Sequence, residues 1–113
     1  MPSSKEYLDF VLEQLSDLES VRYRAMMGEY VIYCAGKVIG GVYDERFLIK
    51  PVPAALRLLA ERGLTPQWEL PYPGAKEMLA PDPDDRELLC SLVRAVADAL
   101  PAPREKKSGK AGL

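Results

Sequence analysis

Met26-Met27-Gly28-Glu29-Tyr30 is the stretch around which we expect this chain to fold. A helix-like segment lies before it and strand-like segments joined by short turns follow it, so the chain turns into its sheet here. Gly28 has no Cβ and can adopt a positive φ or let another backbone approach closely. The methionines and Tyr30 surround this glycine with adaptable apolar surface. These residues leave two interpretations open, a turn that belongs to the core or an exposed turn that binds a partner.

Strand-like segments lie on both sides of this turn. Residues 21–25 alternate with period two, which places Arg22 and Arg24 on one face. Three further segments are rich in β-branched and aromatic residues and follow each other after connections of two or three residues: 30–34, 38–43 and 46–50. Connections this short allow only antiparallel pairing. The pair Gly40-Gly41 inside a strand indicates a bulge, or a place where another surface comes close.

Amphipathic spacing predicts three helices, at about residues 4–18, 54–62 and 84–100. Two capping boxes are expected at the first and last helix, Ser3 with Glu6 and Asp84 with Glu87. Residues 76–80 are expected to add a fifth strand. The predicted fold class is therefore α+β. It is a two-layer α/β sandwich whose antiparallel sheet is a β-meander of about four strands plus the fifth, with the first and last helices packed on one face.

Length and composition predict one folded domain. The chain has 113 residues, of which 48% are hydrophobic and 28% charged, as in ordinary globular proteins. We place the domain at residues 1–103 and expect residues 104–113 to be a disordered basic tail. The formal net charge is −2, and residues 101–113 carry +3, which leaves −5 on the rest. An acidic body disfavours direct binding to duplex DNA.

Several functional classes lose support from what the chain lacks. It has no histidine, which removes the commonest general base and metal ligand. Its two cysteines match no zinc or redox motif, and no apolar run approaches the ~20 residues that span a bilayer. No secretory signal is recognisable at the N-terminus. We therefore expect a cytoplasmic protein that is not an enzyme, with no catalytic residue, no metal, no cofactor and no membrane contact.

Charged side chains offer two further hypotheses. The acidic residues Asp82, Asp84 and Asp85 lack the spacing of a chelating loop and suit the start of a helix better than a metal site. A basic patch on the open face of the sheet is the second hypothesis, formed by Arg22, Arg24, Arg46, Lys50 and Lys76. The alternative is that these cations pair with the carboxylates Glu29, Glu45, Glu69 and Glu77.

Several motifs together resemble the TfoX N-terminal domain family. They are residues 26–30, Gly40-Gly41-Val42-Tyr43-Asp44, Lys50-Pro51, the segment 71–76, and Asp84-Asp85-Arg86-Glu87-Leu88-Leu89. The similarity covers about residues 3–103. It implies a compact two-layer domain with an antiparallel sheet. The family includes the bacterial TfoX/Sxy competence regulators, whose longer members add a C-terminal domain, and this chain is expected to be a stand-alone N-domain.

Three functional classes follow, and we favour the first. It is a small regulatory, protein-interaction module, linked by the resemblance to transcriptional regulation of competence-type genes. The alternatives are a nucleic-acid-binding protein, and a small-ligand-binding protein or enzyme with a pocket near Gly28 and Gly41. The predicted partner is another protein, and a homodimer stays open as an alternative. The predicted partner-binding residues are Met26, Met27, Gly28, Glu29, Tyr30, Gly40 and Gly41.

Overall fold

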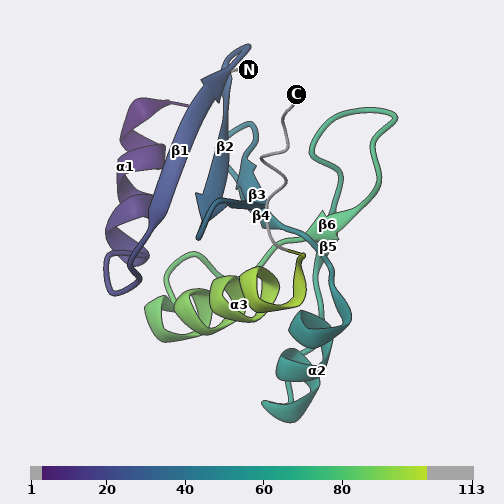
Figure 1. The fold of residues 1–113 in the computed structure, drawn as a ribbon. Coiled ribbons are helices and arrows are strands. Elements are labelled where there is room, and N and C mark those ends of the chain that lie inside the picture. The colour runs from purple at the N-terminus through teal and green to yellow at the C-terminus, as the bar shows by residue number, and fades with distance from the viewer. Residues whose placement is uncertain (1–3, 102–113) are drawn as a thin grey trace, which may run out of the picture.

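The computed structural model describes residues 4–101, which form three helices and one six-stranded sheet (Figure 1). The elements are α1 (Lys5–Gln14), β1 (Val21–Met26), β2 (Glu29–Cys34), β3 (Lys37–Val42), β4 (Phe47–Ile49), α2 (Pro53–Glu61), β5 (Trp68–Glu69), β6 (Met78–Leu79) and α3 (Arg86–Ala99). The strand order is β1-β2-β3-β4-β6-β5 and every neighbouring pair is antiparallel. The predicted fold class and the four-strand meander are confirmed.

Tight turns of one kind build the meander. Each of its three connections has two central residues with positive φ, the geometry of a type I′ turn, whose twist matches that of the strands it joins. The turn residues are Met27 (φ 52°) and Gly28 (86°), Ala35 (55°) and Gly36 (78°), and Asp44 (53°) and Glu45 (63°). Four of these six are not glycine, so the meander is built with some backbone strain.

The predicted irregularity in the third strand is a β-bulge. The register between β2 and β3 shifts at Ile32/Tyr33, which leaves Ile39 as an extra residue before Gly40. A Cβ on Gly40 would lie 2.1 Å from the carbonyl oxygen of Leu48. This glycine therefore lets β4 approach the bulged strand.

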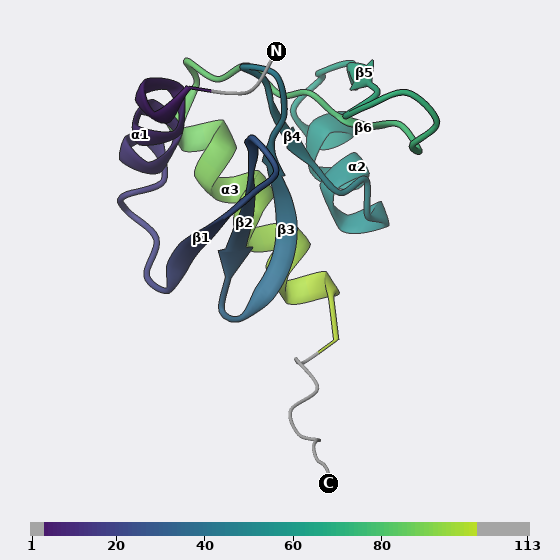
Figure 2. The ribbon, with the colours of Figure 1, turned by 90° about the horizontal axis from the view of Figure 1, so that it is seen from above.

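One core holds the two layers together. It contains buried residues of all three helices and the strand residues of one sheet face, among them Leu8, Ile32, Ile49, Leu59 and Leu92. Helix α3 packs between α1 and α2, behind β2 and β3 in Figure 2. Among residues 4–101, no helix covers the opposite face of the sheet.

Both predicted helix caps are wrong by one residue. At α1 the N-cap is Ser4, whose hydroxyl accepts a bond from the backbone N–H of Tyr7 (3.1 Å), and Ser3 lies outside the described residues. The N–H of Ser4 donates to Glu45 from the β3–β4 turn (2.8 Å), which takes the place expected for Glu6. At α3 the N-cap is Asp85, which accepts from the N–H of Leu88 (3.1 Å).

Two boundaries also differ from expectation. Helix α1 ends at Gln14, and the chain then passes through turns to β1. The segment expected as a fifth strand supplies only Met78–Leu79, and Trp68–Glu69 forms an unexpected short strand beside it. The predicted tail, residues 104–113, lies outside the described residues.

Candidate functional site

The β1–β2 turn projects its methionines into solvent. The Met27 side chain is 100% exposed and that of Met26 is 52% exposed. The exposure of both side chains follows from the two-residue turn. The β1–β2 ladder ends at the pair Met26 and Glu29, so no neighbouring strand lies beside Met27. The core interpretation of the methionines is therefore wrong. Tyr30 differs, since it is half-buried against the core with its ring 5.9 Å from that of Tyr23.

A shallow groove of about 420 Å³ lies beside this tip. Its lining residues come from the start of β2, the β3–β4 turn and the β5–β6 loop: Glu29, Asp44, Arg46, Leu70, Pro71, Tyr72 and Pro73. Met26 pairs directly with Glu29 across the hairpin, so it stands next to the groove. Figure 1 shows the β1–β2 tip and the β5–β6 loop at the same end of the sheet. Leu70 and Tyr72 are 45% and 55% exposed, which extends the apolar surface from the tip across the groove.

Arg46 fixes the far wall of the groove. Its guanidinium pairs with Glu69 (2.7 Å) and donates to the carbonyl oxygens of Tyr43 (3.1 Å) and Pro71 (3.3 Å). Pro71 is buried in consequence, and the exposed residues on either side of it are held in place. The groove is therefore a built feature of the fold.

A protonated phenol, that of Tyr43, lies near two residues that line the groove, Glu29 and Tyr72. Burial raises the pKa of Tyr43, and the negative charge of Glu29 raises it further, with a smaller effect from Tyr72. These three side chains lie close enough to interact. Tyr43 therefore stays neutral at physiological pH and can offer a hydrogen bond.

The two glycines assigned to a partner surface do not form one, and this prediction is wrong. Gly40 and Gly41 are buried. A Cβ on Gly41 would lie 2.5 Å from the carbonyl oxygen of Tyr30 and 3.0 Å from the ring of Tyr43. The surfaces that come close at both glycines belong to the chain itself, so Gly40 and Gly41 shape the sheet and leave no room for a partner.

The predicted basic patch is divided. Arg22 and Arg24 lie on the helix-free face of β1, since they pair with Tyr33 and Val31. Arg46 is held by Glu69, which confirms the alternative pairing for this residue. Lys76 is exposed in the β5–β6 loop and Lys50 is half-buried after β4. The five cations therefore do not make one continuous surface.

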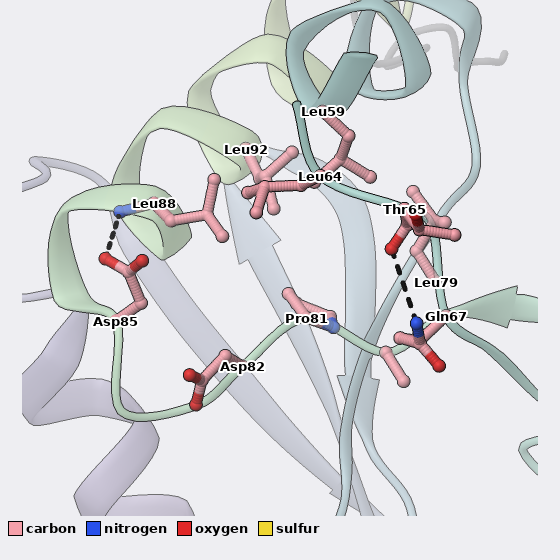
Figure 3. Close-up of a pocket in the computed structure, with 11 residues that line it drawn as sticks. Leu59, Leu64, Thr65, Gln67, Leu79, Pro81, Asp82, Asp85, Leu88 and Leu92 are labelled. Carbon is pink, nitrogen blue, oxygen red and sulfur yellow. Dashed lines mark hydrogen bonds between the residues drawn. The ribbon is translucent and has the colours of Figure 1, made fainter. Parts of the chain in front are cut away.

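A second cavity, of about 230 Å³, lies between α2, α3 and β6. Figure 3 shows its aliphatic wall, formed by Leu59, Leu64, Leu79, Leu88 and Leu92, with Asp82 and Asp85 along one side. Each of these carboxylates already accepts a backbone N–H, from Asp84 (3.0 Å) and Leu88 (3.1 Å). Sequence reasoning missed this space because every wall residue matches an ordinary core or capping pattern.

No cluster suited to metal binding occurs in the part of the chain that the structure describes. Cys34 and Cys90 are both buried free thiols there, and burial raises the pKa of each. Both are therefore weak nucleophiles at neutral pH. Within residues 4–101, no helix has the length and apolar character needed to span a membrane.

Three helices on one face of a six-stranded antiparallel sheet define the chain as a two-layer α+β domain. The family model for the TfoX N-terminal domain matches residues 13–100, and the chain belongs to that family. It is also similar to a curated protein of Spirochaeta aurantia described as "Uncharacterized 12.7 kDa protein in trpE 5'region". The two are 34% identical over 110 residues, which cover 96% of this chain and 92% of the relative.

Proposed function

We propose that this chain is a non-enzymatic regulatory module that binds another protein through the β1–β2 tip and the groove beside it. The binding residues are Met26 and Met27 at the tip, Glu29 in the groove, and Leu70 and Tyr72 on the β5–β6 loop. The resemblance to competence regulators further leads us to propose that its partner acts in transcriptional regulation.

The exposure and backbone conformation of Met27 carry this proposal. Its side chain is fully exposed and its φ is 52°, so it neither packs in the fold nor suits its own turn. Asparagine or glycine would be favoured there if folding alone mattered. Methionine instead supplies flexible, polarisable apolar surface of the kind that protein interfaces use.

The groove adds polar groups to this apolar tip. Glu29 lines the groove and interacts with the neutral phenol of Tyr43, and Arg46 holds Pro71 in the lining. An interface with an apolar centre and a few fixed polar groups at its edge is the usual arrangement for protein recognition. The acidic body supports a protein partner over duplex DNA.

Met27→Glu tests the proposal. The variant should keep the wild-type thermal midpoint, because Met27 contacts nothing, and should lose the partner that the tagged wild-type protein captures and that mass spectrometry identifies. Phe10→Glu is the matched control, since Phe10 is also apolar and partly exposed (36%) but lies on α1. Equal partner capture by Met27→Glu and wild type would contradict the proposal. Submicromolar binding of wild type to duplex DNA at physiological salt would favour the nucleic-acid alternative.

A further inference from the structure

The outer edge of β1 is the second surface with unused binding capacity. β1 is a terminal strand of the sheet and has no strand on its outer side among residues 4–101. Every one of its residues after Val21 is exposed. Six-residue exposed edges are templates for pairing with another strand, and proteins usually cover or shorten them. In Figure 1, β1 stands at one margin of the sheet with α1 beside it.

The register identifies the backbone groups that are available. Ala35 N–H donates to the carbonyl oxygen of Ser20 (3.1 Å), so Ser20 faces β2. Because direction alternates along a strand, Tyr23 and Ala25 point their N–H and C=O groups away from β2. The Val21 carbonyl also points outward, and it accepts a bond from the Arg22 side chain (3.2 Å). Among the described residues, nothing bonds to the outward groups of Tyr23 or Ala25.

A groove of about 350 Å³ runs beside this edge. Its lining comes from the end of α1, the turn after it and the start of β1: Leu12, Leu15, Ser16, Leu18, Val21, Arg22 and Tyr23. The surface is mostly apolar, and the Tyr23 side chain is 43% exposed. A strand added to β1 would place alternate side chains in this groove and the others on the opposite face.

The helix-free face of β1 is basic, and one of its arginines, Arg22, also lines the groove. Arg22 and Arg24 share this face, and in the described residues neither forms an ion pair. Side chains of an added strand that lie across from these arginines should be acidic, because opposite charges stabilise directly paired positions. Side chains of the added strand that enter the groove should be apolar, because the groove lining is mostly apolar.

A second copy of this chain fits the edge poorly. When two β1 strands pair, residues whose N–H and C=O groups point outward must lie opposite each other. Two antiparallel registers meet this condition with the greatest overlap, one centred on Tyr23 and the other on Arg24. The first places Arg22 opposite Arg24, and the second places Arg24 opposite itself. Like charges at directly opposed positions are destabilising. The arginines therefore disfavour self-pairing and favour an acidic partner.

We infer that the outer edge of β1 binds an extended peptide segment of another protein as a seventh strand, with acidic residues facing Arg22 and Arg24 and apolar residues in the α1–β1 groove. This mode of recognition draws affinity from main-chain hydrogen bonds and selectivity from alternate side chains. It uses a surface separate from the Met27 tip and does not depend on the function proposed for that tip.

A blocked octapeptide of alternating glutamate and valine tests the inference, and a lysine–valine peptide of the same pattern is its control. Titration into the isotope-labelled full chain should shift the amide signals of residues 21–26 and slow exchange of the Tyr23 and Ala25 N–H groups. The lysine peptide should bind at least about tenfold more weakly. Arg22→Glu combined with Arg24→Glu should reverse that preference, since each paired position then changes sign.

Backbone pairing is tested from both partners. Ala25→Pro removes an outward donor and should weaken binding about tenfold, the effect of losing one or two hydrogen bonds, whereas Ala25→Val keeps the N–H and should bind normally. Should Ala25→Pro fail to fold, N-methylation of the peptide amides facing β1 removes the same bonds without altering the protein. Equal binding of both peptides, insensitivity to N-methylation, no binding at millimolar peptide, or a dimer formed through β1 would each overturn the inference. Met27→Glu should bind the peptide like wild type, which separates this edge from the tip.

Discussion

Met27 occupies a position where its side chain packs against nothing and its backbone is strained. Its φ of 52° places it in the left-handed region, where a side chain crowds the following carbonyl group. Its neighbour Gly28 adopts φ 86° without that cost. A turn selected for stability alone would carry asparagine at the first position, so the methionine side chain is retained at some expense in stability.

Met27→Asn should therefore stabilise the domain by about 0.5–1 kcal/mol while removing the apolar tip. Urea unfolding followed by circular dichroism measures this change. Met26→Asn is the matched control, because Met26 is an ordinary strand residue and gains nothing from asparagine. A lower midpoint for Met27→Asn than for wild type would show that Met27 supports the fold after all.

At the scale of elements, the sheet depends on one absent side chain. Gly40 lies in the β-bulge of β3, and β4 approaches it so closely that a Cβ would sit 2.7 Å from the Cα of Ile49. Neither neighbour can move independently, since both atoms that a Cβ would meet first belong to the β4 backbone. The approach of these two strands therefore requires glycine.

Gly40→Ala should cost about 3 kcal/mol, at the upper end of overpacking effects, because β3 and β4 must separate. Thermal unfolding of the purified variant measures the loss. Gly63→Ala is a useful comparison, since Gly63 has φ 71° with no atom near its Cβ position and should lose only the ~1–2 kcal/mol of backbone strain. Similar losses for both variants would contradict a steric role for Gly40.

The elements also show how far the sequence predicts this fold. Helical stripes and short turns predicted the meander and the helices because both signals lie within a few residues. The short strand at Trp68–Glu69 was missed because it forms only by pairing with Met78–Leu79, and two residues have no measurable period. The cap at α1 was misplaced because either of two adjacent serines can serve as the N-cap. Glu45, which is distant in sequence, accepts a bond from the N–H of Ser4 and so favours Ser4.

The candidate site was predicted in part for similar reasons. Residues 26–30 could be identified as a turn, but a sequence of apolar residues around glycine does not distinguish a buried turn from an exposed one. Gly40 and Gly41 could be identified as places of close approach, yet only the fold shows that the approaching atoms belong to β4, Tyr30 and Tyr43. The groove needs Leu70 and Tyr72 beside Glu29, and this long-range contact leaves no local pattern.

At the scale of the whole molecule, α3 joins the layers. It packs on α1, α2, β2 and β3, and residues such as Leu89, Leu92 and Val93 are fully or almost fully buried in the common core. Arg62 at the end of α2 also pairs with Glu87 on its exposed side. Stability should therefore depend more strongly on α3 than its share of the chain implies.

Leu92→Ala should cost about 2–5 kcal/mol, since Leu92 is fully buried and its truncation enlarges the cavity that it lines. The free energy of unfolding in urea measures this loss. Leu64→Ala is the control: Leu64 lines the same cavity as Leu92 but is 42% exposed, so a smaller loss is expected. Nearly unchanged midpoints for both variants would contradict the assignment of α3 to the core.

Helix α3 follows every strand of the sheet along the chain, and this order has a consequence for synthesis. The meander leaves the ribosome before α3, and among residues 4–101 only α1 and α2 can cover its apolar face until α3 emerges. A sheet without its packing partner is only marginally stable in water. The apolar residues that α3 will cover therefore stay exposed to water during this interval. The domain must therefore complete its folding after translation of α3, and the rate at which this last helix docks sets how long the newborn protein is exposed to aggregation.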